Sequence, residues 1–111
     1  MERWLHDSPD QAGRAFAEFV RWFFRENRLV RGGLEIGGQA VQPRRITCPL
    51  LNIYATRDHL VPPSASLPLA GLTGSRDYSA FGFDGGHIGI YVSRRAQELL
   101  PRTIAGWLAV R

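Results

Sequence analysis

The chain has 111 residues, 44% of them hydrophobic and 22% charged, a composition typical of one globular domain and not of disordered or collagen-like chains. No apolar run approaches the ~18 residues that a membrane span needs, and the single cysteine, Cys48, excludes a disulfide framework and predicts a reducing, cytoplasmic setting. The net charge is +4, but the 14 basic residues, all arginine, are scattered among acidic ones, which indicates no nucleic-acid partner.

The first predicted element is a helix that begins at Ser8. Ser8 can cap it, Pro9 suits the first helical position, and Gln11 completes a capping-box pattern. Apolar residues then recur at helical spacing on one face: Ala12, Ala15, Phe16, Phe19, Val20 and Phe23. We expect this face to pack on a core and the helix to fade near Asn27. Trp22 and Phe24 widen the apolar surface beyond this face. The alternative interpretation is that these aromatic residues face a partner or a missing part of the same protein.

The next stretch predicts a hairpin and then a buried strand. Residues 34–36 and 39–41 flank Gly37-Gly38, which indicates a small hairpin that serves as a connector. From Leu50 to Ala55 the residues are mostly apolar, as in a strand covered on both faces. A polar turn containing Asp58 follows this strand.

The second half of the chain continues this alternation. It predicts a short helix over 64–72, a second strand over 78–83 that leads into His87, and helical structure over 93–110 that Pro101 divides in two. Strands separated by helices predict parallel pairing in a three-layer α/β fold. Since two parallel strands do not form a self-sufficient sheet, we expect a partial domain, with a helix and connector over 1–45 and the chemical loops and C-terminal helices over 46–111.

The chemistry is expected at the carboxyl ends of the strands, where Asp58 and His87 fall. A neutral imidazole can take a proton from a nucleophile near pH 7, and a carboxylate on its other nitrogen fixes the tautomer. An Asp loop, a helix, a strand and a His loop match the end of an α/β-hydrolase. The alternatives are a turn aspartate and an ordinary loop histidine, and Asp84 is a competing carboxylate; we assign Asp58 as the acid.

The glycines near His87 favour this assignment. Gly85 and Gly86 are expected to allow a sharp turn with unusual dihedral angles, and Gly89 a close approach beyond it. The nucleophile is missing, because the chain contains no G-x-S-x-G or G-x-C-x-G elbow. Cys48 precedes a strand, and we predict that it is a small buried hydrophobe and not a catalytic thiol.

Two stretches resemble poly(3-hydroxyalkanoate) synthases: residues 46–55 with 58–63, and residues 85–93 with Trp107 near the end. The opening, with Trp4 and residues 7–13, is similar to the lid-to-core region of the class III enzymes. The resemblance covers essentially the whole chain but only the last third of the family's catalytic subunit. It implies the C-terminal portion of an α/β-hydrolase fold.

The resemblance implies an acyltransferase that polymerises (R)-3-hydroxyacyl-CoA thioesters into an intracellular polyester and releases coenzyme A. His87 would match the general base of a Cys-His-Asp triad, and Asp58 its acid or a group that assists the attacking 3-hydroxyl. The cysteine that carries the growing chain lies upstream in the family. The implied partners are an accessory subunit, a second catalytic subunit and the polyester granule. Neither a cofactor nor a metal is expected, since the coenzyme A thioester is a substrate.

Without a nucleophile, the chain is expected to be inactive alone. It could be a truncated gene product, one piece of a split enzyme, or an incomplete gene model that begins at an internal Met; we favour the last. The alternative functions are part of an ordinary esterase with a serine nucleophile, and a non-catalytic fragment that binds granules or a full synthase.

Overall fold

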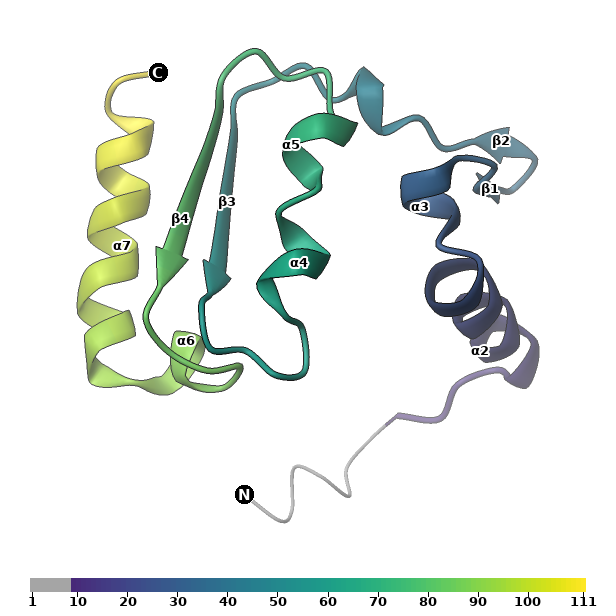
Figure 1. Ribbon diagram of the computed structural model, residues 1–111, viewed down its shortest axis with the longest axis horizontal. Helices are drawn as coiled ribbons and strands as arrows, with labels where there is room; N and C mark the ends of the chain where they lie inside the picture. The colour runs from purple at the N-terminus through teal and green to yellow at the C-terminus, as the bar shows by residue number, and fades with distance from the viewer. Residues whose placement is uncertain (1–8) are drawn as a thin grey trace. The chain divides into compact units, whose positions relative to one another are not determined.

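The computed structural model describes residues 9–111, which form two compact units divided between Gln42 and Pro43 (Figure 1). The predicted cap Ser8 and the resembling residues Trp4 and Asp7 lie outside this range. Among the described residues, no helix is both long and apolar enough to cross a membrane.

The N-terminal unit begins with helix α2 (Gly13–Phe19), which continues into the π-helix η1 (Val20–Arg25). The predicted start at Pro9 is wrong: residues 9–12 are not helical, and the capping position is Ala12, whose methyl group cannot accept a hydrogen bond. Asn27 ends this helical run in a left-handed conformation (φ 47°), near the predicted end, and the single turn α3 (Arg28–Arg31) follows.

The described residues of the N-terminal unit do not cover the apolar face of α2, contrary to the expectation of a helix packed on a core. α2 and η1 contain no buried residue, and Phe16, Phe19 and Phe24 are 55%, 48% and 74% exposed. The physical reason is size, because a unit of this length contains too few residues to build a second layer.

The predicted hairpin is confirmed. β1 (Glu35–Ile36) and β2 (Gln39–Ala40) pair antiparallel. Gly37 and Gly38 both have positive φ (58° and 73°), which is the conformation that a two-residue hairpin turn requires. The 3₁₀ turn η2 (Pro43–Arg45) then opens the C-terminal unit.

The C-terminal unit is built on two parallel strands, β3 (Leu50–Ala55) and β4 (Tyr78–Phe83), at the predicted positions. Their register pairs Leu50 with Tyr78 and Ala55 with Phe83. Because side chains alternate between the faces of a strand, Asn52 and Tyr78 share one face, and Ala55 and Phe83 share the other.

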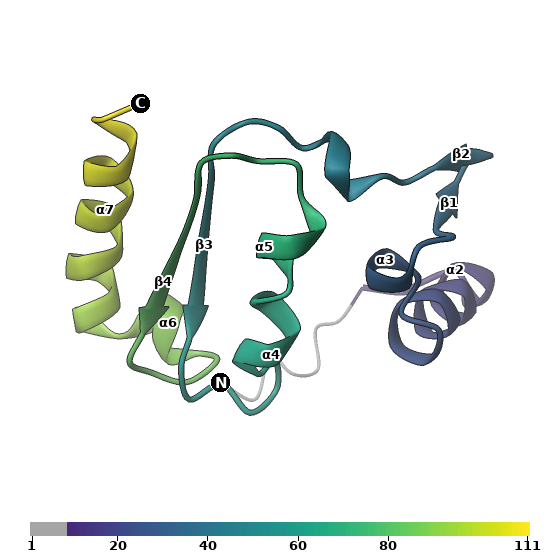
Figure 2. The ribbon, with the colours of Figure 1, turned by 45° about the horizontal axis from the view of Figure 1, so that its top comes forward.

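Helices cover both faces of this strand pair. Ser66 of α4 (Pro63–Ser66) hydrogen-bonds to Asn52 on the first face. Arg95 of α7 (Arg94–Leu108) lies over the Phe83 ring on the second. Figures 1 and 2 accordingly show α7 and α4 on opposite sides of the strands. Ala55 and Phe83 lie on the face of the sheet that meets α7, and Ala96 lies on α7. All three are buried, so the core of this unit lies between the sheet and α7. The unit therefore has an α/β arrangement.

Proline affects the two helical regions differently. The predicted helix over 64–72 is interrupted: α4 ends at Ser66 and α5 (Leu69–Leu72) begins after Pro68, which has no N–H to donate. The predicted division at Pro101 is wrong, because α7 runs through it. Pro101 removes the donor for the Gln97 carbonyl, but both residues are exposed, where water can replace that bond.

Candidate active site

The two predicted loops meet at one edge of the sheet. Because β3 and β4 are parallel, both arrows end beside α6 (Gly89–Val92), as Figure 1 shows. The strand pairing continues past these ends: the Thr56 N–H donates to the Phe83 carbonyl (2.8 Å) and the Arg57 N–H to the Gly85 carbonyl (2.9 Å). These bonds hold the loop after β3 against the loop after β4.

The Asp58 and His87 side chains are in direct contact, as predicted. Asp58 Oδ2 lies 2.8 Å from His87 Nδ1. The other carboxylate oxygen, Oδ1, accepts hydrogen bonds from the backbone N–H groups of Leu60 (2.9 Å) and Val61 (2.8 Å). An ionised carboxylate only accepts hydrogen bonds, so the imidazole donates from Nδ1 and keeps Nε2 free to take a proton.

The carboxylate is buried and ionised. The Asp58 side chain is 8% exposed and the His87 side chain 36%. Burial raises the pKa of Asp58, but hydrogen bonds from the Val61 N–H, His87 and the Leu60 N–H together outweigh it and hold the pKa below its ordinary value. Asp58 is therefore an anion at neutral pH, and a charge in this position can stabilise a protonated imidazole.

Asp84, the competing carboxylate, has other partners. It forms ion pairs with Arg57 (Nε to Oδ1, 3.0 Å) and Arg95 (Nη1 to Oδ2, 3.5 Å), and its side chain is 57% exposed. His59 is also exposed. The pair is thus formed by Asp58 and not by the carboxylate nearer to His87 in sequence.

The glycines near His87 do not play the predicted roles. Gly85, Gly86 and Gly89 do not adopt the positive φ that unusual dihedral angles would require. At Gly85 a Cβ would lie 2.5 Å from the Phe83 ring, so glycine is needed there for close approach. At Gly86 a Cβ would make ordinary contact, and at Gly89 it would meet nothing within 4 Å, so no close approach occurs there.

Cys48 is exposed, so the prediction of a buried residue is wrong. The strand begins only at Leu50, and residues 44–49 before it are exposed. Cys48 lies before the amino end of β3, whereas Asp58 follows its carboxyl end. The six-residue strand between them spans roughly 20 Å. Cys48 therefore cannot act as the nucleophile for His87 in this structure.

The backbone donors from Leu60 and Val61 were not identified from the sequence. An aspartate that accepts from N–H groups two and three residues ahead forms a common turn, so Asp58 is a turn residue as well as the histidine's partner. Across residues 9–111, no cluster of three or more His, Cys, Asp or Glu side chains could hold a metal ion.

No family model matches the chain. Three curated relatives named poly(3-hydroxyalkanoate) polymerase subunit PhaC align with all of it. The identity is 53% for the protein from Allochromatium vinosum, 47% for that from Thiocystis violacea and 46% for that from Synechocystis sp.. The chain is homologous to part of this polymerase subunit. It spans 31%, 31% and 30% of the three relatives' lengths, so the rest of the subunit has no counterpart among these 111 residues.

Proposed function

We propose that the chain is the C-terminal part of the α/β-hydrolase catalytic domain of a poly(3-hydroxyalkanoate) synthase, and that Asp58 and His87 supply the acid and base of its Cys-His-Asp triad. The observation that carries this proposal is the 2.8 Å contact between Asp58 and His87 at the carboxyl ends of adjacent parallel strands, in a chain homologous to the polymerase subunit. The nucleophilic cysteine lies outside these residues, and the chain alone is inactive.

In the proposed reaction, His87 Nε2 takes the proton from the cysteine thiol. The thiolate attacks the carbonyl carbon of an (R)-3-hydroxyacyl-CoA, and coenzyme A leaves as its thiol with a proton returned by the imidazolium. Asp58 stays ionised, holds the imidazole with Nε2 toward the thiol and stabilises the positive charge. Thiolates both attack and leave readily, so the acyl chain can pass between thioesters.

The proposal extends to partners and location. We assign to the whole protein an acyl-CoA substrate, an accessory subunit, a second copy of the catalytic subunit and a cytoplasmic location at the polyester granule. Support comes from the resemblance of the Asp58 and His87 segments to these synthases, from the resemblance of the opening, Trp4 with residues 7–13, to the class III enzymes, and from the polymerase name of the relatives. Each partner is testable by co-purification with the full-length protein.

The test compares three substitutions in the full-length protein, with coenzyme A release and acylation of the cysteine as readouts. His87→Ala is expected to lower acylation by about a thousandfold or more, as for other members of such triads. Asp58→Ala is also expected to lower the rate of acylation strongly. The matched control Asp84→Ala should change that rate by less than about threefold, because Asp84 is in an exposed ion pair. Equal losses for Asp84→Ala and Asp58→Ala would refute the assignment of the acid.

The coding sequence before Met1 distinguishes the proposal from the esterase alternative. We expect an in-frame G-x-C-x-G elbow within about 300 codons, the scale of one such domain. A serine in place of that cysteine would indicate an esterase. The absence of any elbow, together with granule binding that survives His87→Ala, would indicate a non-catalytic binding fragment.

A further inference from the structure

A second buried polar side chain lies in the same unit as the Asp58–His87 pair. Asn52 of β3 is 8% exposed, and its amide makes three hydrogen bonds. Its Oδ1 accepts from the Ser66 hydroxyl (2.7 Å), and its Nδ2 donates to the Ser66 carbonyl (3.2 Å) and to the Tyr78 hydroxyl (2.9 Å). Three of the four bonds that an asparagine amide can make are therefore satisfied within the protein.

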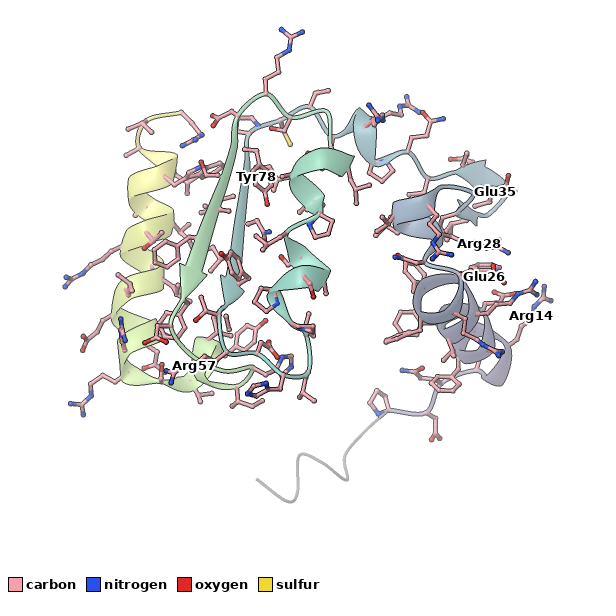
Figure 3. All side chains as sticks on the ribbon, viewed as in Figure 1. Arg14, Glu26, Arg28, Glu35, Arg57 and Tyr78 are labelled. Carbon is pink, nitrogen blue, oxygen red and sulfur yellow. The ribbon has the colours of Figure 1, made fainter. Side chains whose placement is uncertain are left out.

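These bonds join three elements. Asn52 is in β3, Ser66 is the last residue of α4, and Tyr78 is the first residue of β4. The loop over 56–62 that carries Asp58 runs from β3 to α4, so the Asn52 amide ties together the two elements at its ends. Figure 3 shows the labelled Tyr78 and Arg57 at opposite ends of the strands, with Tyr78 at the end away from that loop.

The geometry links α4 to the carboxylate. The Leu60 and Val61 N–H groups that bind Asp58 Oδ1 are three and two residues before Pro63, where α4 begins. A shift of α4 on the sheet would therefore move both donors away from Oδ1. Apolar packing alone resists such sliding poorly because it has no preferred direction, whereas a planar amide with bonds to both a hydroxyl and a carbonyl of one residue fixes the position of the helix.

We propose that Asn52 is a positioning residue: through Ser66 it places α4, and through α4 it sets the backbone donors that orient the Asp58 carboxylate toward His87. Tyr78 contributes less, because it binds only one of the two Nδ2 protons and belongs to β4, not to α4. This inference rests on the proposed acid–base role of the pair, but its test measures the geometry of the pair and not the reaction.

The test follows the His87 ring by NMR in the full chain labelled with ¹⁵N-histidine. In the unsubstituted chain we expect the Nδ1–H tautomer and a slowly exchanging Nδ1 proton. Asn52→Leu keeps the branching of the side chain, with two somewhat larger methyl groups, but removes all three bonds. It is expected to speed exchange of that proton by about tenfold or more, the factor that corresponds to losing a hydrogen bond to a charged group, and to populate the Nε2–H tautomer. Ser66→Ala should act in the same direction.

Matched controls separate positioning from unfolding. Tyr78→Phe should give a smaller change, and Tyr91→Phe, at a tyrosine that is 73% exposed, none. The backbone amide shifts of β3 and β4 report whether each variant folds. If Asn52→Leu does not fold, Ser66→Ala decides, because it leaves both strands unchanged.

The proposal is overturned if a folded Asn52→Leu or Ser66→Ala chain keeps the Nδ1–H tautomer and its slow exchange. A failure of the proposed function gives a different result. His87→Ala would then leave acylation of the full-length protein unchanged, whatever the tautomer measurement shows.

Discussion

The two units of this chain are held together by different kinds of contact. In the C-terminal unit, β3 pairs with β4 from a distant part of the sequence, and the contact between Asp58 and His87 joins residues 29 positions apart. In the N-terminal unit the contacts are local. The ion pairs among its described residues link Arg14 to Glu18, and Arg21 and Arg28 to Glu26, within five residues; Figure 3 labels Arg14, Glu26 and Arg28. A site that needs a carboxylate and an imidazole from separate loops can form only where distant segments are held together.

Aromatic residues show the same contrast. In the N-terminal unit, the Phe19 ring lies 5.3 Å from the Phe23 ring and 5.4 Å from the Phe24 ring, yet Phe19 and Phe24 remain exposed to solvent. In the C-terminal unit, Phe83 is 2% exposed. Contact between rings on one helix is therefore not equivalent to burial between layers, and only the latter removes most of the apolar surface from water.

The largest expected difference between the units is in the cost of truncating a phenylalanine. Phe83→Ala should lower the free energy of unfolding by about 3–5 kcal/mol, the usual cost of emptying a buried aromatic site. Phe16→Ala should change it by less than about 0.5 kcal/mol, since that ring is exposed. Urea unfolding, with hydrogen exchange of the β4 amides, measures both. Equal costs would show that the N-terminal unit is as closely packed as the sheet.

The next contrast concerns acid stability. The pKa of Asp58 is lower in the folded chain than its ordinary value, so the unfolded chain takes up the proton first as the pH falls. The stabilisation is complete above the ordinary carboxyl pKa and is lost as the pH falls through the folded value. Urea midpoints between about pH 6 and about pH 3 should therefore fall more steeply for the unsubstituted chain than for Asp58→Asn.

Glu26 provides the matched comparison. Hydrogen bonds from Arg21 and Arg28 lower the pKa of Glu26, but these groups are partly exposed. Glu26→Gln should also flatten the acid slope, and salt should remove most of that difference because it screens surface charges. The Asp58→Asn difference should survive salt. If salt removed both differences equally, Asp58 would behave as a surface charge.

The smallest expected effect concerns helix capping. The Ser93 hydroxyl accepts from the Ala96 N–H (3.1 Å) at the start of α7, whereas Ala12 offers no such group to α2. Ser93→Ala should cost about 1 kcal/mol of stability, and Ala12→Ser should increase helical content. Circular dichroism and urea unfolding measure these changes. A loss of helicity in Ala12→Ser would contradict the assigned start of α2.

The parts of the fold that were predicted correctly depend on short-range patterns. Apolar runs bounded by turn residues located both strands, and the Gly37-Gly38 pair located the hairpin, because local conformation decides these features. The contact between Asp58 and His87 was predictable because parallel strands end at one edge. The predicted start of the first helix was wrong: the capping-box pattern at Ser8 predicted helix over residues 9–12, which are not helical. The predicted break at Pro101 was also wrong: α7 continues through this exposed position, where water can replace the lost hydrogen bond.

Other features of the site could not be predicted from the sequence. The exposure of Cys48 follows from where the strand begins, and the need for glycine at Gly85 follows from where the Phe83 ring lies. The bonds of Asn52 depend on the position of α4 on the sheet. Each of these depends on which side chains from distant segments meet, and spacing within one segment carries no such information.

The amino-acid sequence by itself determined the two strands, their parallel order and which carboxylate and imidazole meet, because chain order and strand direction place both loops at one sheet edge. Only the tertiary structure decided that the Asp58 carboxylate faces His87 and that Asp84 pairs with arginines instead. Those outcomes depend on distances of about 3 Å between groups, which arise only when separate elements pack in one arrangement.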